Sequence, residues 1–440
     1  MGSNKGELSG DCDMYEHAFL EVLDRELVVA LGCTEPIAIA LASAVASNHL
    51  KEPLEFLEVY ASGNIIKNAM GVSIPGTGKT GMNLAAALGS LGDADRKLEV
   101  LSGISEDNIL EATQMISAGR IRINKADILK KLYIEVHATS LHGYSKVIIE
   151  DRHTNITHIE ADGEVLFDLK EQVLQKEEEY SFMNMETILE FIESVPVEKL
   201  GKVEESIRIN KKIGEEGIRK DYGLKVGKTL FEAMEKGHQS NDPINYAMAL
   251  TSGGSDARMA GSSLSVMSNS GSGNQGITAT LPVIAFWEKM NLSEELLLRS
   301  VALSHLITIY MKTKFGRLSA LCGATIAATG ASCGITYLLG GKKKEIHGAI
   351  QNMLGNVTGM ICDGAKGGCA LKVATCTSAA CMSSTLALSG IAIGCQEGII
   401  EEDAEKTIEN LGILSCEGGK EADRIILGIM LDKENKRKTT

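Results

Sequence analysis

The sequence has no surplus of positive charge, because 58 aspartate and glutamate residues outnumber 44 lysine and arginine residues. The formal net charge of −14 over 440 residues argues against nucleic acid or an anionic membrane as the main partner. The first 15 residues also lack the apolar segment of a secretory signal peptide. We therefore expect a cytoplasmic protein whose ten cysteines are free or metal-bound rather than joined in disulfides.

Charged residues are also missing from two stretches, 318–340 and 373–393, each about as long as a membrane span. Both stretches lack an aromatic belt and a basic flank, and both are crowded with Gly, Ala, Ser, Thr and Cys. We interpret them as helices buried inside a large helical domain rather than as membrane spans.

The apolar pattern predicts an α+β protein in which a smaller α+β domain is inserted in the N-terminal half of a large all-α domain. Strands are expected at 55–61, 132–136 and 144–150, and Asp162-Gly163 is a strong hairpin signal. The three predicted parts are 1–52, N-terminal helices packing on the large domain; 53–198, the α+β domain; and 199–440, the all-α domain.

Beyond about residue 200 the apolar spacing is helical almost to the end of the chain. The predicted helices are 203–212, 215–237, 243–252, 276–290, 294–312, 318–340, 344–360, 373–397, 403–414 and 420–435.

The segment 362–369, Cys-Asp-Gly-Ala-Lys-Gly-Gly-Cys, resembles half of a metal site. On a regular helix Cys362 and Cys369 would lie about 10 Å apart along the axis, so we expect this glycine-rich segment to curl and bring the thiols together. Lys366 would then favour their thiolate forms. The alternative is a tight turn between helices that holds two core cysteines, because this spacing is less specific than paired CxxC motifs.

A second candidate thiol is Cys33, in Gly-Cys-Thr-Glu-Pro at 32–36, just before an alanine-rich helix. The positive end of a helix favours a thiolate, which makes Cys33 a candidate base or nucleophile. The alternative is a small residue that fills a corner between two helices.

Two glycine-rich segments are candidates for anion binding. The polar run from 252 to 258 leads into 267–276, which opens a helix and is interpreted as a binding loop rather than a flexible linker. The segment 74–80 resembles a phosphate-binding loop, but Ser73 stands where that motif needs glycine. We therefore do not expect it to bind ATP, although it still offers amides to an anion.

The remaining thiols and imidazoles show no ligand spacing. Free cysteines in apolar helices are usually core residues, so spacing alone does not show which would complete a site with Cys362 and Cys369; these are Cys322, Cys333, Cys376, Cys381 and Cys395. Four histidines are predicted to lie on the surface: His137, His142, His153 and His158. The residues by themselves predict a thiolate-bound metal centre, most naturally iron–sulfur, beside an anion-binding loop.

Five segments together, at 32–36, 63–68, 74–78, 268–276 and 362–369, resemble the L-cysteine desulfidase family in the same order along the chain. That family is related through its helical domain to the alpha chain of iron–sulfur L-serine dehydratases. The resemblance implies that 199–440 is the cluster-binding catalytic domain. It implies that Cys33 is the proton acceptor and that Cys322, Cys362 and Cys369 bind three irons of a [4Fe-4S] cluster. The implied substrate-binding residues are Ser270, Gly271, Ser272, Gly273 and Asn274.

The implied reaction is β-elimination on a small L-amino acid, converting L-cysteine to pyruvate, ammonia and sulfide. L-serine or another β-substituted amino acid is an alternative substrate, and a pyridoxal-phosphate lyase would catalyse the same elimination with a different cofactor. A non-catalytic iron–sulfur redox sensor is the alternative of another class. The expected partner is the amino acid, with neither nucleic acid nor membrane, and a homodimer is one option for assembly. Lys67, Lys79 and Lys366 are candidate partners of a carboxylate or thiolate, or else solvated lysines.

Overall fold

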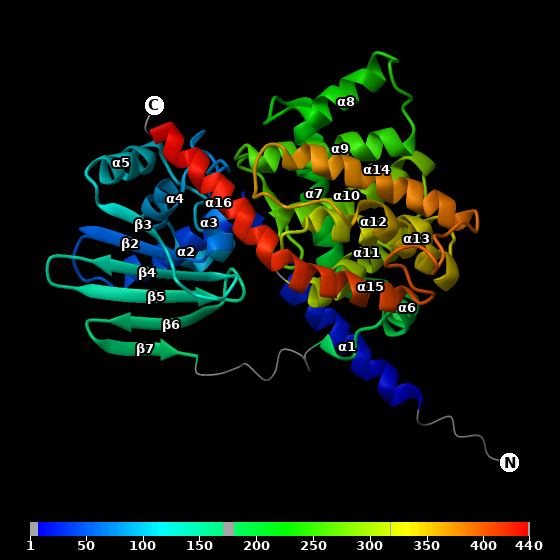
Figure 1. Ribbon diagram of the computed structural model, residues 1–440, viewed down its shortest axis with the longest axis horizontal. Coiled ribbons are helices and arrows are strands. Elements are labelled where there is room, and N and C mark those ends of the chain that lie inside the picture. The colour runs from blue at the N-terminus through cyan, green and yellow to red at the C-terminus, as the bar shows by residue number, and fades with distance from the viewer. Residues whose placement is uncertain (1–7, 170–179, 317, 439–440) are drawn as a thin grey trace.

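The computed structural model describes residues 8–169, 180–316 and 318–438 and places a twisted sheet with its helices beside a large bundle of helices (Figure 1). The six-stranded sheet has the order β3-β2-β4-β5-β6-β7, in which β2 and β3 are parallel and the other neighbours are antiparallel. Its strands are β2 (Phe56–Ala61), β3 (Ile121–Lys125), β4 (Tyr133–Thr139), β5 (Tyr144–Glu150), β6 (Ile156–Ala161) and β7 (Glu164–Asp168).

The sheet is half-buried, because burial alternates along β2 and β5 as side chains point to opposite faces. Helices α2 (Thr34–Asn48) and α4 (Met82–Gly89) pack against it and contact each other, and α5 (Glu106–Ser117) packs on α4. The expected hairpin is confirmed, since Asp162 and Gly163 adopt φ of 50° and 84° between β6 and β7. We call this assembly of strands and helices the sheet part.

The helical part is built around α9 (Pro243–Met259), α10 (Gly273–Met290), α11 (Glu294–Phe315) and α12 (Gly323–Leu338), which share one hydrophobic core. The surrounding helices are α1 (Leu8–Glu26), α6 (Met185–Ser194), α7 (Gly201–Arg219), α8 (Val226–Glu235), α13 (Lys343–Val357), α14 (Cys369–Leu388) and α15 (Ala404–Ile413). Short 3₁₀ turns, η1 (Ala94–Glu99) and η3 (Val197–Lys199), and a π-helical turn, η4 (Leu414–Gly418), complete the connections. No helix in the described ranges is both long and apolar enough to cross a membrane.

Several helix limits differ from the prediction. The predicted helix 215–237 is two helices, α7 and α8, and residues 318–322 and 389–397 are not helical. Residues 252–258, expected to belong to a loop, lie inside α9. The reason is close packing, because a Cβ on Gly217 would lie 1.9 Å from the carbonyl oxygen of Gly253. The small residues therefore allow α7 and α9 to approach and do not make the chain flexible.

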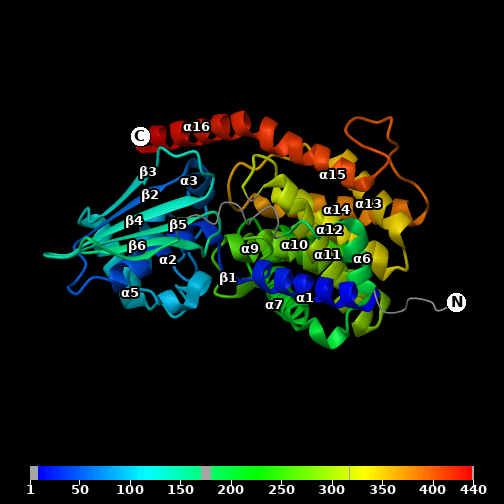
Figure 2. The same cartoon turned by 90° about the horizontal axis from the view of Figure 1, so that it is seen from below.

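Two contacts between elements join the sheet part to the helical part. Strand β1 (Val29–Leu31) pairs with β8 (Ser265–Met267), and α3 (Gly63–Ala69) lies beside the C-terminal helix α16 (Gly419–Lys438). Figures 1 and 2 both show α16 running from the helical part across to the sheet part.

The predicted limits of the three domains remain a prediction. Within the predicted unit 1–52, α1 contributes Phe19 and Leu23 to the core of the helical part, whereas α2 contributes Ile37 and Ile39 to the core of the sheet part. The chain therefore changes packing partner between α1 and α2.

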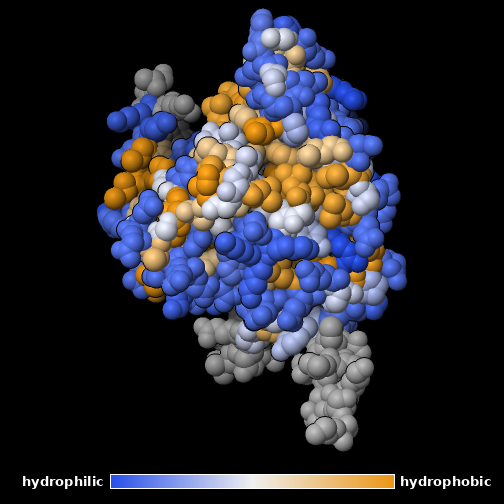
Figure 3. All heavy atoms as spheres, turned by 90° about the vertical axis from the view of Figure 1, so that its right-hand side faces the viewer, coloured by the Kyte–Doolittle hydropathy of each residue, from blue (hydrophilic) through white to orange (hydrophobic). Residues whose placement is uncertain are grey.

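The end of the helical part that faces away from the sheet carries a band of hydrophobic side chains between charged ones (Figure 3). Exposed apolar residues of α14 include Leu371 and Met382, which are 54% and 49% exposed. The structure contains a single chain, and the homodimer considered from the sequence stays a prediction.

Candidate active site

Cys322 and Cys362 lie on two neighbouring backbone segments. Leu321 and Ile361 form an isolated antiparallel bridge, the Cys322 amide donates to the Met360 carbonyl at 2.8 Å, and the Cys362 amide donates to the Ala320 carbonyl at 2.6 Å. Cys322 is the N-cap residue of α12. The bridge therefore fixes two of the three predicted cluster ligands beside each other.

Cys369, the third predicted ligand, is the first residue of α14. The intervening segment is not helical, as its spacing and glycines predicted, and Gly364 adopts a φ of 91°. Glycine is required there, because a Cβ would lie 2.3 Å from the carbonyl oxygen of Lys67. We call residues 362–369 the cysteine loop.

Two of the three thiols have raised pKa values. Burial, followed by the neighbouring Cys362, raises the pKa of Cys322 to about 12. Burial also raises the pKa of Cys369, with Cys362 adding to the effect and Lys366 and Lys372 opposing it.

Lys366 acts on Cys369 in the predicted direction, because it lowers the pKa of that thiol, but the expected thiolate form is wrong for Cys369, because desolvation by the surrounding protein outweighs Lys366 and raises the pKa. The Lys366 ammonium forms an ion pair with Asp363, and Lys372 Nζ lies 2.5 Å from the same carboxylate. Both ammonium groups therefore pair with the carboxylate of Asp363, which lies within the cysteine loop.

Cys33 is the N-cap residue of α2 and is 1% exposed. It forms a small apolar cluster with Val72 and Met259, against which Ala365 and Cys369 pack. The candidate base and the cysteine loop are thus brought together, although they lie far apart in the sequence.

The predicted thiolate preference of Cys33 is also wrong. Burial raises the pKa of the Cys33 thiol well above its ordinary value, and the negative charge of Glu35 adds to this, while Arg258 partly opposes it. The thiol donates a hydrogen bond to Glu35 Oε2 at 3.1 Å. Here desolvation, together with the carboxylate, outweighs the favourable end of the helix.

Glu35 connects several of the functional candidates. Its carboxylate accepts hydrogen bonds from Thr34 Oγ1 at 3.1 Å and from Asn68 Nδ2 at 2.9 Å, as well as from Cys33. Burial alone would raise the pKa of Glu35, but His153, Cys33 and Arg258 outweigh it and hold the pKa below its ordinary range. Glu35 is therefore a buried anion.

His153 was predicted to lie on the surface, and this is wrong. The side chain is 5% exposed, its Nε2 lies 3.9 Å from Glu35 Oε1, and neither ring nitrogen has a hydrogen-bond partner among the described residues. No sequence signal predicted this contact, because it depends on how the β5–β6 connection meets the start of α2.

The predicted substrate-binding residues form a tight turn at the start of α10. Ser270 and Gly271 have φ of 49° and 81° between the bridged residues Asn269 and Ser272. The Gly271 carbonyl accepts a hydrogen bond from Thr34 Oγ1 at 2.9 Å, so the turn lies against the residue that follows Cys33.

The first turn of α10 contains the other predicted substrate residues. A Cβ on Gly273 would lie 2.2 Å from Arg258 Nε, which donates to the Gly32 carbonyl at 2.9 Å. Asn274 Oδ1 is buried without a hydrogen-bond partner among the described residues. These contacts bring the turn, α9 and the Cys33 segment into one assembly.

A buried histidine that the sequence analysis did not single out supports this turn. His305 Nε2 lies 2.9 Å from Ser206 Oγ, and its Nδ1 lies 3.0 Å from Asn269 Nδ2. Burial lowers the pKa of His305 to about 3, so the ring is neutral and serves as a hydrogen-bonding support.

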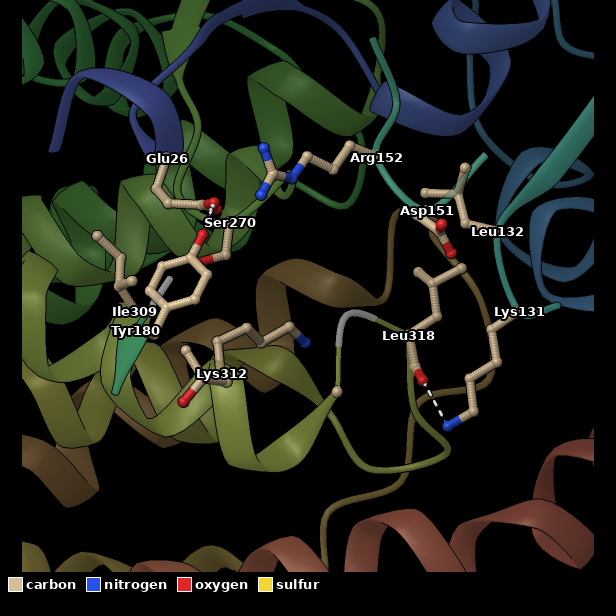
Figure 4. A pocket seen from close by; sticks show the side chains of 12 residues that line it. Glu26, Lys131, Leu132, Asp151, Arg152, Tyr180, Ser270, Ile309, Lys312 and Leu318 are labelled. Carbon is tan, nitrogen blue, oxygen red and sulfur yellow. Dashed lines mark hydrogen bonds between the residues drawn. The ribbon is translucent and has the colours of Figure 1, made fainter. Parts of the chain in front are cut away.

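A cavity of about 370 Å³ lies between the sheet part and the helical part, and Ser270 is the predicted substrate residue that lines it. Figure 4 shows Arg152 entering from the sheet part, Lys312 from α11 and Glu26 from α1. Glu26 accepts a hydrogen bond from Tyr180 at 2.5 Å. A cavity that has both positive and negative side chains suits a small zwitterion.

The three lysines that the sequence left open have protein partners. Lys67 Nζ lies 2.5 Å from Asp423 Oδ1, Lys79 Nζ lies 3.3 Å from Thr113 Oγ1, and Lys366 pairs with Asp363. None of these three contacts is with a thiol.

Fold and site together define an α+β protein in which Cys33 packs against the cysteine loop and the neighbouring Thr34 bonds a glycine-rich turn at the start of α10. The chain belongs to the serine dehydratase alpha chain family, whose sequence profile matches residues 95–428.

Relatives cover nearly the whole chain. A UPF0597 protein of Oleidesulfovibrio alaskensis is 47% identical over 420 residues, which is 94% of this chain and 98% of the relative. A UPF0597 protein of Clostridium perfringens is 45% identical over 423 residues, or 96% and 99% of the two chains. One from Parabacteroides distasonis is 44% identical over 421 residues, or 94% and 97%.

Proposed function

We propose that this protein is an iron–sulfur-dependent lyase that eliminates the β-substituent of a small L-amino acid, with L-cysteine as the first candidate substrate. One observation carries the proposal: Cys33 packs against the cysteine loop while the adjacent Thr34 binds the 270–271 turn. These contacts support the assignment of a proton acceptor, metal-binding thiols and a substrate turn to one site.

The chemistry of the donor set supports an iron–sulfur cluster. Cys322 and Cys362 lie on neighbouring bridged segments and Cys369 opens α14, although no three His, Cys, Asp or Glu side chains in the described parts of the chain are grouped closely enough to hold a metal ion. Ligands of different irons in a cluster need not converge on one point, and thiolates are the usual ligands of such clusters. We assign these three cysteines to a [4Fe-4S] cluster.

When bound, a cluster with three protein ligands supplies one open iron as a Lewis acid and supplies positive charge that favours thiolates. The remaining functions belong to the side chains of this chain. Ser270 and its turn hold the amino acid, and Arg152 and Lys312 supply positive charge for its carboxylate in the cavity.

Cys33 is assigned the removal of the Cα proton. Cys33 must act in its thiolate form, and Glu35 Oε2, at 3.1 Å, accepts the hydrogen bond of the thiol and positions the sulfur rather than taking its proton. Loss of the Cα proton and of the β-substituent, as sulfide from cysteine or water from serine, leaves aminoacrylate. Its imine tautomer takes up water and gives pyruvate and ammonia.

L-serine is the second candidate substrate, because the family profile that matches the chain is that of serine dehydratase alpha chains. The two substrates differ in the leaving group, and the same proton acceptor and cavity would serve both.

The test is anaerobic purification with cluster reconstitution, followed by assays of pyruvate from both amino acids and of sulfide from L-cysteine. We expect sulfide and pyruvate in equal amounts and in proportion to bound iron. An intact cluster without product from either amino acid would contradict the proposal and favour the redox sensor. A borohydride-sensitive absorption band with activity independent of iron would favour a pyridoxal-phosphate lyase.

A further inference from the structure

A buried lysine connects three distant segments of the chain at the edge of the cysteine loop. Lys67, on α3, is 1% exposed, and its ammonium lies 2.5 Å from Asp423 Oδ1 on α16. The same ammonium donates to the carbonyl oxygen of Cys362 at 3.4 Å. One charge therefore bonds both the C-terminal helix and a predicted cluster ligand.

Backbone contacts extend the contact between α3 and the cysteine loop. The carbonyl of Lys67 leaves no room for a Cβ at Gly364, and a Cβ on Gly71, just beyond α3, would lie 3.5 Å from the Ala365 carbonyl. At the first residue of α3, a Cβ on Gly63 would lie 2.8 Å from the Leu427 side chain of α16. Helix α3 thus touches both the cysteine loop and α16, and α16 also reaches the loop directly, because a Cβ on Gly364 would lie 3.4 Å from the Met430 side chain.

The cost of an unpaired buried charge makes the hydrogen bond from Lys67 to Cys362 depend on the ion pair with Asp423. An ammonium without water is stable only when it is paired, and the loss of one partner of a buried ion pair leaves an uncompensated charge. Lys67 therefore keeps its buried position only while α16 supplies Asp423. The hydrogen bond to the Cys362 carbonyl consequently depends on a helix from the far end of the chain.

We propose that Lys67 is a positioning residue for iron–sulfur binding: it fixes the backbone of Cys362, and α16 holds Lys67 in place through Asp423. This inference rests on the proposed cluster, but it concerns how the loop is held rather than which residues bind iron. It assigns α16 a function in keeping the metal site formed.

The experiment separates positioning from simple stability. Lys67→Met and Asp423→Asn each leave a buried partner unmatched, so both should lower the melting temperature. The double variant Lys67→Met with Asp423→Leu replaces the pair by apolar groups, an exchange that is often neutral or stabilising. Arg424→Gln is the control, because Arg424 is also on α16 and in an ion pair, but its side chain is 72% exposed.

After anaerobic reconstitution, iron loss to a chelator is followed by the cluster absorption, and melting temperature is measured in parallel. We expect the double variant to melt near the wild-type temperature yet to lose iron about tenfold faster, an effect of the size given by one hydrogen bond from a charged donor. Wild-type iron retention in the double variant would overturn the proposal, since the pair would then be purely structural.

Amide hydrogen exchange on the cluster-free proteins keeps this result distinct from the proposed cofactor. Faster exchange across 362–369 in the double variant, with unchanged exchange in α10, supports the positioning role even if the wild type binds no iron. Unchanged exchange across 362–369 would overturn it. Absence of iron from the reconstituted wild type would instead count against the proposed cluster.

Discussion

Cys33 is a buried thiol and Cys369 a partly buried one, and both stand at the start of a helix, yet the charged side chains that act on them differ in sign. Cys33 donates to the carboxylate of Glu35, whereas Lys366 and Lys372 act on Cys369 and lower its pKa against the effects of burial and of Cys362. The first arrangement holds a proton on sulfur, and the second is suited to exchange protons for a metal cation. We call Cys33 and Glu35 the proton-holding region, and the proposed ligands Cys322, Cys362 and Cys369 the metal-binding region. Position at a helix start therefore does not determine what a thiol does, and the following predictions test this difference.

The largest effect is expected from the thiols of the metal-binding region. Cys362→Ser or Cys369→Ser should lower iron affinity by more than about 100-fold, because even changes behind metal ligands cost about 10–100-fold. Turnover should fall to background with the iron. Iron per protein after anaerobic reconstitution is the measurement, and Cys395→Ser is the control because that thiol is exposed. If Cys362→Ser or Cys369→Ser kept its full iron content, the proposed difference between the metal-binding and proton-holding regions would be contradicted.

The second prediction concerns the proton-holding region. Cys33→Ala should retain iron and its absorption spectrum but lose about 10²–10⁴-fold in kcat, the range for removal of a general base. The comparison with the ligand variants is decisive, because both changes remove activity while only one removes iron. Normal turnover in Cys33→Ala would disprove its assignment as the proton acceptor.

The sequence predicted the local features of both regions better than their surroundings. The spacing and glycines of 362–369 correctly excluded a helix, and Asp162-Gly163 correctly predicted a hairpin, because both are consequences of local backbone preference. The pKa of Cys33 was misjudged because helix-end effects are local, whereas desolvation and the charge of a neighbouring carboxylate depend on tertiary burial.

Other errors have the same origin. The run 252–258 was misread because small residues that let two helices approach have the same composition as a flexible loop. His153 was misplaced because its neighbour Glu35 lies in a different element of the fold. The resemblance supplied Cys322 as a third ligand, which spacing could not select from five cysteines in apolar segments. The bridge between Leu321 and Ile361 now provides a structural reason for its position beside Cys362.

The third prediction uses acid to test the proton-holding region. The folded-state pKa of Glu35 lies below its reference of 4.5, so its ionised form stabilises the fold above that pH, and this contribution is lost as the pH falls through the folded-state value. Glu35→Gln should lower the free energy of unfolding at pH 7 by about 1–3 kcal/mol, the cost of unsatisfied buried groups, and should weaken the decline below about pH 4.5. Denaturant titrations at several pH values measure both effects, with Glu111→Gln, an exposed carboxylate on α5, as the control. If the free energy of unfolding of Glu35→Gln fell below about pH 4.5 as steeply as that of the wild type, Glu35 would not be the buried anion that distinguishes Cys33 from Cys369.

The smallest effect is expected outside both regions, in the cavity beside the 270–271 turn. If the two thiol regions carry the chemistry and the cavity binds the amino acid, Arg152→Gln should raise KM about tenfold and change kcat little, because a charge used equally in the ground and transition states affects binding alone. Arg122→Gln is the matched control, since Arg122 lies on β3 with its side chain 64% exposed. Steady-state kinetics on the reconstituted enzyme measure kcat and KM separately. A fall in kcat with unchanged KM would instead move Arg152 into the chemistry, next to its neighbour His153 and the Glu35 anion, and would extend the proton-holding region into the cavity.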